Sequence, residues 1–304
     1  MHSPSTPHAV LVAALWMSGA LLSFMAMAVG GRELSAQLST FQILFFRSLV
    51  GLVVISLLLR RAGWGQVAGR PFGLHLLRNL AHFGGQFGWF YGLAFIPLAE
   101  VFAIEFTVPI WTALWAAVLL GERLSGPRLA AVGLGIAGLL IMLRPGSQSV
   151  HPAALAVLAG AVGYALSHTL TRRLALSDPP LVILFYMTVI QLPLGLLPAL
   201  ATWTTPAPAL WPWLLVVGLS ALSAHYCMAR ALALAPATVV VPMDFLRLPL
   251  IAVVGALVYG ERLEWSVLAG AAVMLLGNWI NISAERRRAR RQARPADALL
   301  PRRP

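Results

Sequence analysis

Two segments of the chain, residues 97–124 and 236–263, are copies of one apolar sequence. A shift of 139 residues brings the string Gly-Glu-Arg-Leu of one copy onto the identical string of the other. Apolar helices can be aligned by chance, but a shared string at the same offset as two prolines argues against that explanation. The matched positions are Pro97 with Pro236, Glu105 with Asp244, and 121–124 with 260–263. A duplicated apolar sequence with one acid in each copy is typical of membrane transporters.

The composition places this duplicated sequence in a membrane. Hydrophobic residues make up 59% of the 304 residues and charged residues only 11%, with a mean hydropathy of +0.82. A soluble domain is less apolar and does not need repeated apolar stretches of about 20 residues. Ten such stretches can be read, at residues 9–30, 40–59, 73–96, 98–120, 127–143, 152–171, 181–201, 211–234, 237–259 and 264–283.

Helices are the expected structure of these ten stretches. The hydrocarbon core of a bilayer cannot form hydrogen bonds with backbone N–H and C=O groups, so only helices and closed barrels span it. Barrel strands would alternate apolar and polar residues, and these stretches do not. The first stretch contains Ala26-Met27-Ala28, which resembles a signal-peptide cleavage site, but it lacks a basic leading region. We therefore keep it as a helix and predict an all-α integral membrane protein with ten transmembrane helices.

The positive charge of the chain lies where it would orient a membrane protein. All 22 basic residues are arginines, and the net charge is +12. Eight arginines follow the last apolar stretch and most others lie in one set of alternate loops, while the opposite loops hold only Arg32, Arg144 and Arg262. By the positive-inside rule both termini are predicted to be cytoplasmic. The basic tail is expected to contact anionic lipids of the bilayer and not nucleic acid.

Five stretches in each half is an odd number, so the second half must enter the membrane upside down relative to the first. We therefore predict two inverted five-helix repeats, at residues 1–145 and 150–283, followed by a disordered basic tail at 284–304. The arginine distribution agrees, because it places residues 121–124 on the cytoplasmic side and residues 260–263 on the outer side. Inverted repeats bind their substrate near the bilayer midplane, between the halves.

The pattern of each half resembles the EamA domain of the drug/metabolite transporter superfamily. In the first copy it is carried by Pro97-Leu98-Ala99, Pro109, residues 121–124 and the helix with Gly133 and Gly138. In the second copy it is carried by Ala235-Pro236-Ala237, Pro249, residues 260–263 and the helix through Gly277. The resemblance covers nearly the whole chain except the tail. It implies a transporter, in a family that moves amino acids, nucleotide-linked metabolites, riboflavin, S-adenosylmethionine or opine-type metallophores, some outward and some inward.

Charged residues at membrane depth usually face a cavity or a charged partner. The candidates are Arg47 in the second stretch, Glu105 in the fourth, and Asp244 and Arg247 in the ninth. Asp244 and Arg247 can form an ion pair on one helical face, and Arg47 could form an ion pair with Glu105. These pairs could simply fix helix packing. Alternatively they line a central cavity, where carboxylates bind an amine or a proton and guanidinium groups hold carboxylates. Glu100 is expected at the membrane interface.

Polar and aromatic side chains form a stripe along the third stretch. They are spaced by three and four residues: Asn79, His82, Gln86 and Trp89. In the repeat Gln86 falls on His225, which is followed by Tyr226. His82, Gln86, His225 and Tyr226 are therefore candidate substrate-binding residues in a hydrated cavity; hydrogen bonding between helices is the alternative. The histidines and the single cysteine have no metal-ligand spacing, so neither a metal nor a cofactor is predicted.

Prolines and repeated acids suggest how the helices bend and dock. Pro109 is predicted to interrupt the fourth stretch, and Pro242 and Pro249 the ninth, which frees carbonyl groups and allows kinks. Glu122 and Glu261 come directly after their stretches. Their repetition favours a role in capping a loop or docking a helix over contact with a substrate.

The predicted function is secondary transport of a small polar or zwitterionic metabolite across the bacterial inner membrane by alternating access. The chain has no nucleotide-binding loop and no lysine to complete one, so a proton or an exchanged solute is expected to drive transport. Export of an amino-acid-like compound or opine-type metallophore fits the acids and arginines best, and import of riboflavin or S-adenosylmethionine is the alternative. A membrane-embedded enzyme or a sensor fits less well, because paired acids at the cytoplasmic mouth and a soluble domain are both missing. Two repeats in one chain permit a monomer, and a homodimer is also open.

Overall fold

The structure is a computed structural model. It describes residues 7–67, 72–121, 125–144, 150–235, 240 and 243–292. Within these ranges the secondary structure is helical throughout. The helices of the first half are α1 (Pro7–Ser35), α2 (Thr40–Ala62), α3 (Phe72–Phe95), α4 (Leu98–Glu105), α5 (Val108–Leu120) and α6 (Gly126–Leu143). Those of the second half are α7 (Pro152–Leu174), α8 (Pro180–Ala199), α9 (Trp211–Leu234), α11 (Arg247–Tyr259) and α12 (Trp265–Gln292).

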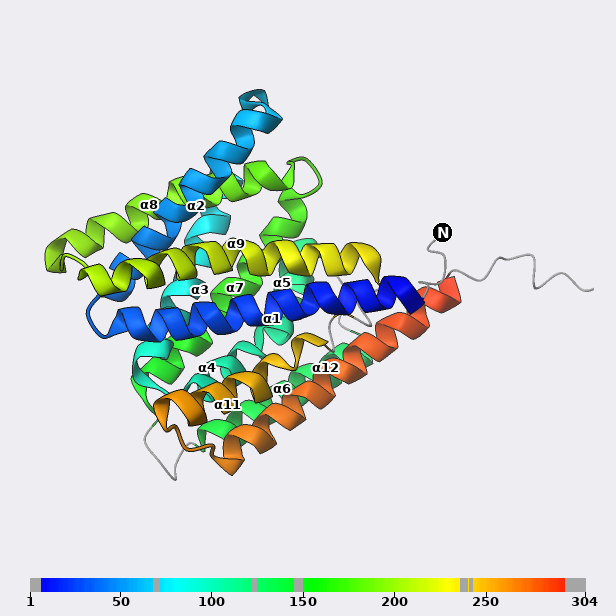
Figure 1. Ribbon diagram of the computed structural model, residues 1–304. Coiled ribbons are helices and arrows are strands. Elements are labelled where there is room, and N and C mark those ends of the chain that lie inside the picture. The colour runs from blue at the N-terminus through cyan, green and yellow to red at the C-terminus, as the bar shows by residue number, and fades with distance from the viewer. Residues whose placement is uncertain are drawn as a thin grey trace, which may run out of the picture.

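The described helices confirm the predicted all-helical membrane fold. Eight segments in the described part of the chain are long and apolar enough to cross a bilayer, with α4 and α5 together forming one of them. The two remaining spans are α3, which carries the polar stripe, and α11, which is apolar but short. The start of α1 and the end of α12 lie at the same end of the bundle (Figure 1), as an even number of spans requires.

Two details of the chain differ from the sequence-based expectations. The fourth stretch is divided at Phe106 and Thr107, two residues before Pro109, which lies in the first turn of α5. The last helix continues to Gln292, so the disorder expected from residue 284 does not hold for 284–292. Arginine and alanine are strong helix formers, and positive charge near a helix C-terminus is stabilised by the helix dipole.

The break between α4 and α5 follows from backbone chemistry. Pro109 has no N–H to donate to the carbonyl of Glu105, so the helical ladder is interrupted there. Ile110 N–H instead donates to the Thr107 carbonyl at 2.9 Å, a tighter turn. The Phe106 carbonyl that this leaves is met at 3.5 Å by the Asn278 side-chain amide of α12, from the other half. A break at membrane depth is therefore satisfied within the protein, as hydrocarbon surroundings demand.

The two halves pack around an approximate two-fold axis. The most extensive helix contacts are α1 with α9, α3 with α7, α2 with α8 and α6 with α12. Under the 139-residue repeat the α1–α9 contact becomes the α7–α3 contact, while α2–α8, α6–α12 and the smaller α4–α11 contact map onto themselves. Because each half has five spans, corresponding helices run in opposite directions. The arrangement is therefore that of two inverted repeats, as predicted.

Glycines bring α6 and α12 close together in a symmetric way. A Cβ on Gly138 would meet the Gly270 carbonyl, and one on Gly277 would meet the Ala131 carbonyl. These two contacts are copies of each other under the repeat, with alanine replacing glycine at one of the four positions. Close backbone approach through small residues is how membrane helices gain packing energy, because lipid provides no hydrophobic driving force between them.

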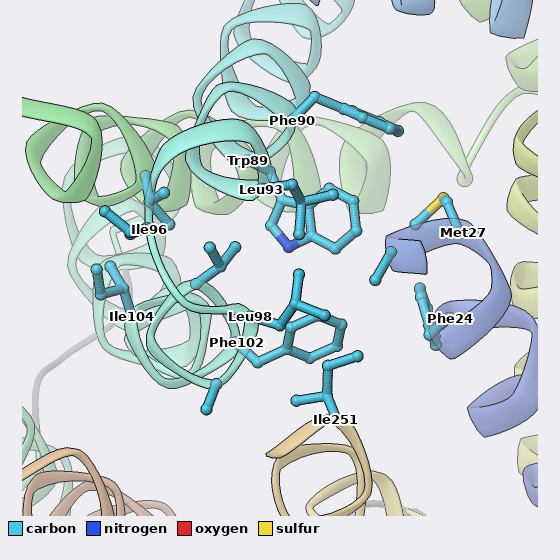
Figure 2. Close-up of a cluster of buried hydrophobic side chains, with 14 of the residues drawn as sticks. Phe24, Met27, Trp89, Phe90, Leu93, Ile96, Leu98, Phe102, Ile104 and Ile251 are labelled. Atoms are coloured by element: carbon cyan, nitrogen blue, oxygen red, sulfur yellow. The ribbon is translucent and has the colours of Figure 1, made fainter. Parts of the chain in front are cut away.

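Apolar side chains cover the outside of the bundle and fill much of its interior. Val118 and its repeat counterpart Leu257 are 74% and 82% exposed, as expected of side chains that face lipid. Inside, a cluster joins α1, α3, α4 and α11, and Figure 2 shows Phe24, Trp89, Phe102 and Ile251 converging from these four helices. This cluster connects the halves beside the breaks and holds the charged residues described next.

Candidate functional site

An ion-pair triad joins the halves at the helix breaks. Arg247, the first residue of α11, donates to Asp244 Oδ2 at 2.9 Å and to Glu105 Oε1 at 3.3 Å. Glu105 is the last residue of α4, so its bond to Arg247 crosses between the halves. The other Glu105 oxygen accepts from the Trp89 indole N–H of α3 at 2.9 Å. One arginine thus faces two carboxylates, and the triad carries one net negative charge when all three groups are ionised.

Aromatic rings surround the arginine of the triad. The guanidinium carbon lies 4.6 Å from the ring centre of Phe24, 5.8 Å from that of Phe102 and 5.7 Å from that of Phe106. Arginine is stabilised over aromatic faces, most strongly where water is excluded. Figure 2 shows Phe102 below Trp89 in the middle of the cluster and Phe24 at its side, on α1. These phenylalanines were not predicted as site residues, because their helical spacing looks like that of ordinary core positions.

The predicted pairing of Arg47 with Glu105 is not present. Glu105 is bonded to Arg247 and Trp89. Arg47 is 8% exposed, and no hydrogen bond or ion pair is formed by it with the described residues; its Nε is buried without a partner. The expectation of one acid and one arginine in each half is therefore corrected. The short Asp244 side chain holds Arg247 close enough to α4 for this single arginine to reach both acids.

A buried polar cluster follows the predicted stripe on α3. His82 Nδ1 lies 3.0 Å from Gln86 Nε2 and 2.9 Å from Gln191 Nε2 of α8. Gln191 also reaches Asn79 Oδ1 at 3.4 Å. The stripe is therefore brought together as predicted, and it crosses to the other half. Gln191 was missed, although a glutamine inside an apolar membrane stretch is itself a signal for such a contact.

His225 lies near the triad, whereas Tyr226 does not. The His225 ring is exposed and lies edge-on to Phe24, with 6.2 Å between ring centres, and Phe24 covers Arg247. Tyr226 is 57% exposed and packs against Trp16 on the α1–α9 surface. The structure thus places His225 beside the other site residues and Tyr226 away from them, because successive residues on a helix point about 100° apart.

Tyr164 of α7 connects the two groups of polar residues. Its ring packs edge-on against His82 at 5.4 Å and stacks at 6.3 Å on His168, which is exposed. Its hydroxyl is within electrostatic reach of Glu105, Arg47 and Arg247. We call the set of residues the central polar region: Arg47, His82, Gln86, Glu105, Tyr164, His168, Gln191, His225, Asp244 and Arg247. The His168 and His225 side chains of this region are exposed.

The predicted helix-breaking prolines lie in first turns and not in mid-helix. Pro109 is in the first turn of α5, and Pro249 is the third residue of α11. Pro249 leaves the Phe245 carbonyl without its helical donor, as Pro109 does for Glu105. Pro242 lies outside the described residues. The Phe245 carbonyl accepts from the Leu248 N–H at 3.3 Å instead. Both described prolines thus occur beside the triad, at the breaks in the two helices.

Polar bonds also hold the ends of the bundle. At the end opposite the chain termini, Glu261 accepts from the Leu98 backbone N–H at 2.9 Å and pairs with Arg32 at 2.9 Å. Glu261 therefore docks the start of α4, as expected for this acid; Glu122 lies outside the described residues. At the other end His75 of α3 pairs with Asp178, before α8, at 2.8 Å. Each of these bonds joins one half to the other.

A groove elsewhere on the molecule is apolar. It has a volume of about 390 Å³ between α3, α5 and α7, and Gly84, Phe87 and Trp115 contribute to its lining. It lies on the face of α3 opposite the His82–Gln86 stripe, so it is not part of the central polar region. Among the described residues no cluster of three potential metal ligands occurs.

Comparisons with known proteins identify the family. The model of the EamA-like transporter family matches residues 11–144 and 151–283. A riboflavin transporter of Rhizobium johnstonii is 30% identical over 94% of this chain and 96% of its own length. An S-adenosylmethionine uptake transporter of Rickettsia prowazekii is 25% identical over 85% of this chain and 88% of its own. The pseudopaline exporter CntI of Pseudomonas aeruginosa is 28% identical over 88% and 96%.

A solved crystal structure has the same fold. It superposes with a TM-score of 0.63 at 19% identity and covers 90% of this chain and 98% of the other. The family match extends over both halves, so the protein is a multi-pass membrane transporter of small molecules and not an enzyme. The broken helices, the triad between the halves and the two matched domains lead to one identification: the chain belongs to the EamA-like transporter family.

Proposed function

We propose that the protein is a secondary transporter of a small zwitterionic metabolite in the bacterial inner membrane, with both termini in the cytoplasm. The observation that carries this proposal is the Glu105–Arg247 ion pair, which joins the halves where α4 ends and α11 begins. Alternating access requires the halves to separate on one side and close on the other. A bond between the halves at the centre is well placed to control this movement.

Neutralising the triad acids would loosen that bond. If Glu105 binds a proton or the amine of a solute, its attraction for Arg247 falls, and Arg247 retains only Asp244 within its own half. Asp244 Oδ1 is buried without a hydrogen-bond partner among the described residues. A carboxylate oxygen without a donor can accept a hydrogen bond from an ammonium group of a solute. The triad therefore couples the binding of a positive charge to the release of α4 from α11.

The charges of the central polar region favour an amino-acid-like solute, and outward transport of such a compound is the first candidate. The pseudopaline exporter among the relatives supports it. Uptake is the second candidate, favoured by the S-adenosylmethionine uptake transporters, whose substrate also contains an amino-acid group. Riboflavin is neutral and does not use the triad charges, although the aromatic rings around Arg247 suit its planar ring system.

Transport assays with acid variants test the proposal. The protein would be reconstituted in liposomes with S-adenosylmethionine, riboflavin or an opine-type metallophore on either side, with and without a proton gradient. Glu105→Gln and Asp244→Asn are expected to abolish coupled transport while the protein remains inserted. Glu264→Gln serves as the control, because Glu264 is an exposed acid remote from the triad. Normal transport by both triad variants would show that the acids only fix helix packing.

A further inference from the structure

We propose that Arg47 binds the anionic group of the transported solute, so that the central polar region accepts compounds carrying a carboxylate or a similar oxyanion. The inference rests on the proposed function, because it assigns one part of the solute to one residue of that site. It begins from the different partners of three buried arginines: Arg47, Arg78 and Arg247.

Only one of these arginines lacks partners in the part of the chain that the structure describes. Arg247 is held by two carboxylates and three phenyl rings. Arg78 donates to Thr171 Oγ1 at 3.0 Å and to Asn79 Oδ1 at 2.7 Å. Arg47 has neither an acid nor a hydrogen-bond acceptor, although it is as buried as the others. Its guanidinium donors are therefore available to a ligand.

A buried cation without a partner is costly at membrane depth. The loss of hydration is several kcal/mol for an unpaired ion, so charged residues persist in membrane spans mainly where they serve a substrate or an ion. Burial of Arg47 is therefore unfavourable unless an anion occupies the site during the transport cycle. A guanidinium group matches a carboxylate or phosphate with two parallel hydrogen bonds.

Arg47 faces the central polar region from the axis between the halves. It lines a narrow crevice with Thr188 and Gln191 of α8, and with Met187. Met187 is the repeat counterpart of Arg47 at an offset of 140 residues, which aligns Leu44-Phe45 of α2 with Leu184-Phe185 of α8. Gln191 connects the crevice to His82 at 2.9 Å. His82 and His225 are both within electrostatic reach of Arg47. A solute that contacts these histidines would have its anionic group beside the free guanidinium.

The charges of the region are separated into two sides. The triad carries one net negative charge, while Arg47 and Arg78 form a positive side, and neither makes an ion pair with a described acid. Tyr164 lies between the sides, in reach of Arg47 and of the triad. A zwitterion would therefore bind with its amine toward Glu105 and Asp244 and its carboxylate toward Arg47. The repeat does not supply a second anion site, because Arg47 corresponds to Met187 in the other half.

The first test needs no ligand. Thermal unfolding of the purified full-length protein would be compared for the wild type, Arg47→Met and Arg47→Gln. Met is the residue of the repeat counterpart and has a similar length. If Arg47 serves a ligand, both variants should melt at the same temperature as the wild type or higher, because an unpaired buried charge has been removed. A melting temperature lowered by several degrees in both variants would show a structural role and overturn the proposal.

The second test uses matched probe compounds. Three pairs differ only in an anionic group: S-adenosylmethionine and its decarboxylated form, riboflavin 5′-phosphate and riboflavin, and an opine-type acid and its methyl ester. In at least one pair the anionic member should bind the wild type more tightly, as measured by ligand-induced stabilisation. Arg47→Met should weaken binding of that member by about tenfold to a hundredfold, the range for charged hydrogen bonds, and leave its partner unchanged.

The control variant is Arg230→Met, because Arg230 is exposed and stacks on Trp16 away from the site. It should retain the anion preference. A preference that survives Arg47→Met, or the absence of a preference in all three pairs, would overturn the proposal. Neither result depends on transport, so failure here is distinguishable from failure of the proposed function, which is read from Glu105→Gln and Asp244→Asn in liposomes.

Discussion

The two halves keep the same backbone at their centres but not the same side chains. The turn after α4 at Phe106 matches the one at Phe245, and α5 and α11 have equal lengths. Both end at a left-handed glycine, Gly121 with φ 66° and Gly260 with φ 62°. The side chains around this shared backbone differ at nearly every polar position, so the duplication preserved the backbone and not the polar side chains.

The divided chemistry explains why only one acid bridges the halves. Glu105 receives the indole N–H of Trp89, whereas the counterpart of Trp89 beside Asp244 is Met228, which has no such donor. Val108 occupies the position that corresponds to Arg247, so one arginine serves both acids. Asp244 therefore keeps a free oxygen, and Glu105 has both oxygens bonded. The asymmetry assigns bridging to Glu105 and leaves Asp244 with one buried, unbonded oxygen.

The largest effect is expected from Arg247→Leu. It leaves Glu105 and Asp244 without their cation, and removing one partner of a buried ion pair costs about 3–5 kcal/mol. Thermal unfolding should occur at a clearly lower temperature, and transport should be lost. The exposed Arg230→Leu is the control. A variant that melts like the wild type would show that the triad does not hold the halves together.

A smaller loss is expected from Gly88→Ala at the α3–α7 crossing. An added Cβ would meet the Ala156 carbonyl, and overpacking of this kind costs about 1–3 kcal/mol. The repeat counterpart is Cys227 at the α1–α9 crossing, where it already fills the space beside Gly19. Cys227→Ala should therefore change the melting temperature less than Gly88→Ala. Equal losses would contradict a closer approach of α3 and α7.

The variant Trp89→Phe tests the difference between Glu105 and Asp244. Phenylalanine keeps an aromatic ring but removes the N–H bonded to Glu105, and a hydrogen bond to a charged group contributes about 1.5–3 kcal/mol. Transport driven by a proton gradient should shift its dependence on pH, because the Glu105 carboxylate loses the hydrogen bond that it accepts from the indole. Met228→Leu is the matched control in the other half. If both variants leave the pH profile unchanged, the indole does not tune Glu105.

The fold was predictable because hydropathy and repetition act over long segments. Residues 11–144 and 151–283 match one family model twice, and the sequence offset alone paired Glu105 with Asp244 and Gly121 with Gly260. The exact partner of each charge was not predictable. Arg47 and Arg247 were both candidate partners of Glu105, and only the packed structure shows that Arg247 is the one that reaches it.

Contacts between helices that are distant in the sequence were also not predictable from the sequence. The sequence predicts Tyr226 as a site residue because it follows His225. Consecutive residues of a helix point in different directions, however, and Tyr226 lies on the α1–α9 surface. Gln191 was missed because its partners are on α3, in the other half. Periodicity within one helix predicts which residues share a face; it does not predict which helix that face meets.

The smallest expected effect concerns the left-handed glycines that end α5 and α11, which both halves share. Gly121→Ala and Gly260→Ala each place a Cβ in a left-handed conformation at the end of α5 or α11, which costs about 1 kcal/mol. Apart from the chain neighbours, no atom of a described residue lies within 4 Å of either added Cβ, so backbone strain is the expected effect. The two variants should lower the melting temperature by similar small amounts. A much larger loss for Gly260→Ala would mean that the Glu261 contacts with Arg32 and Leu98 depend on this cap, and the halves would then differ in backbone function as well as in side chains.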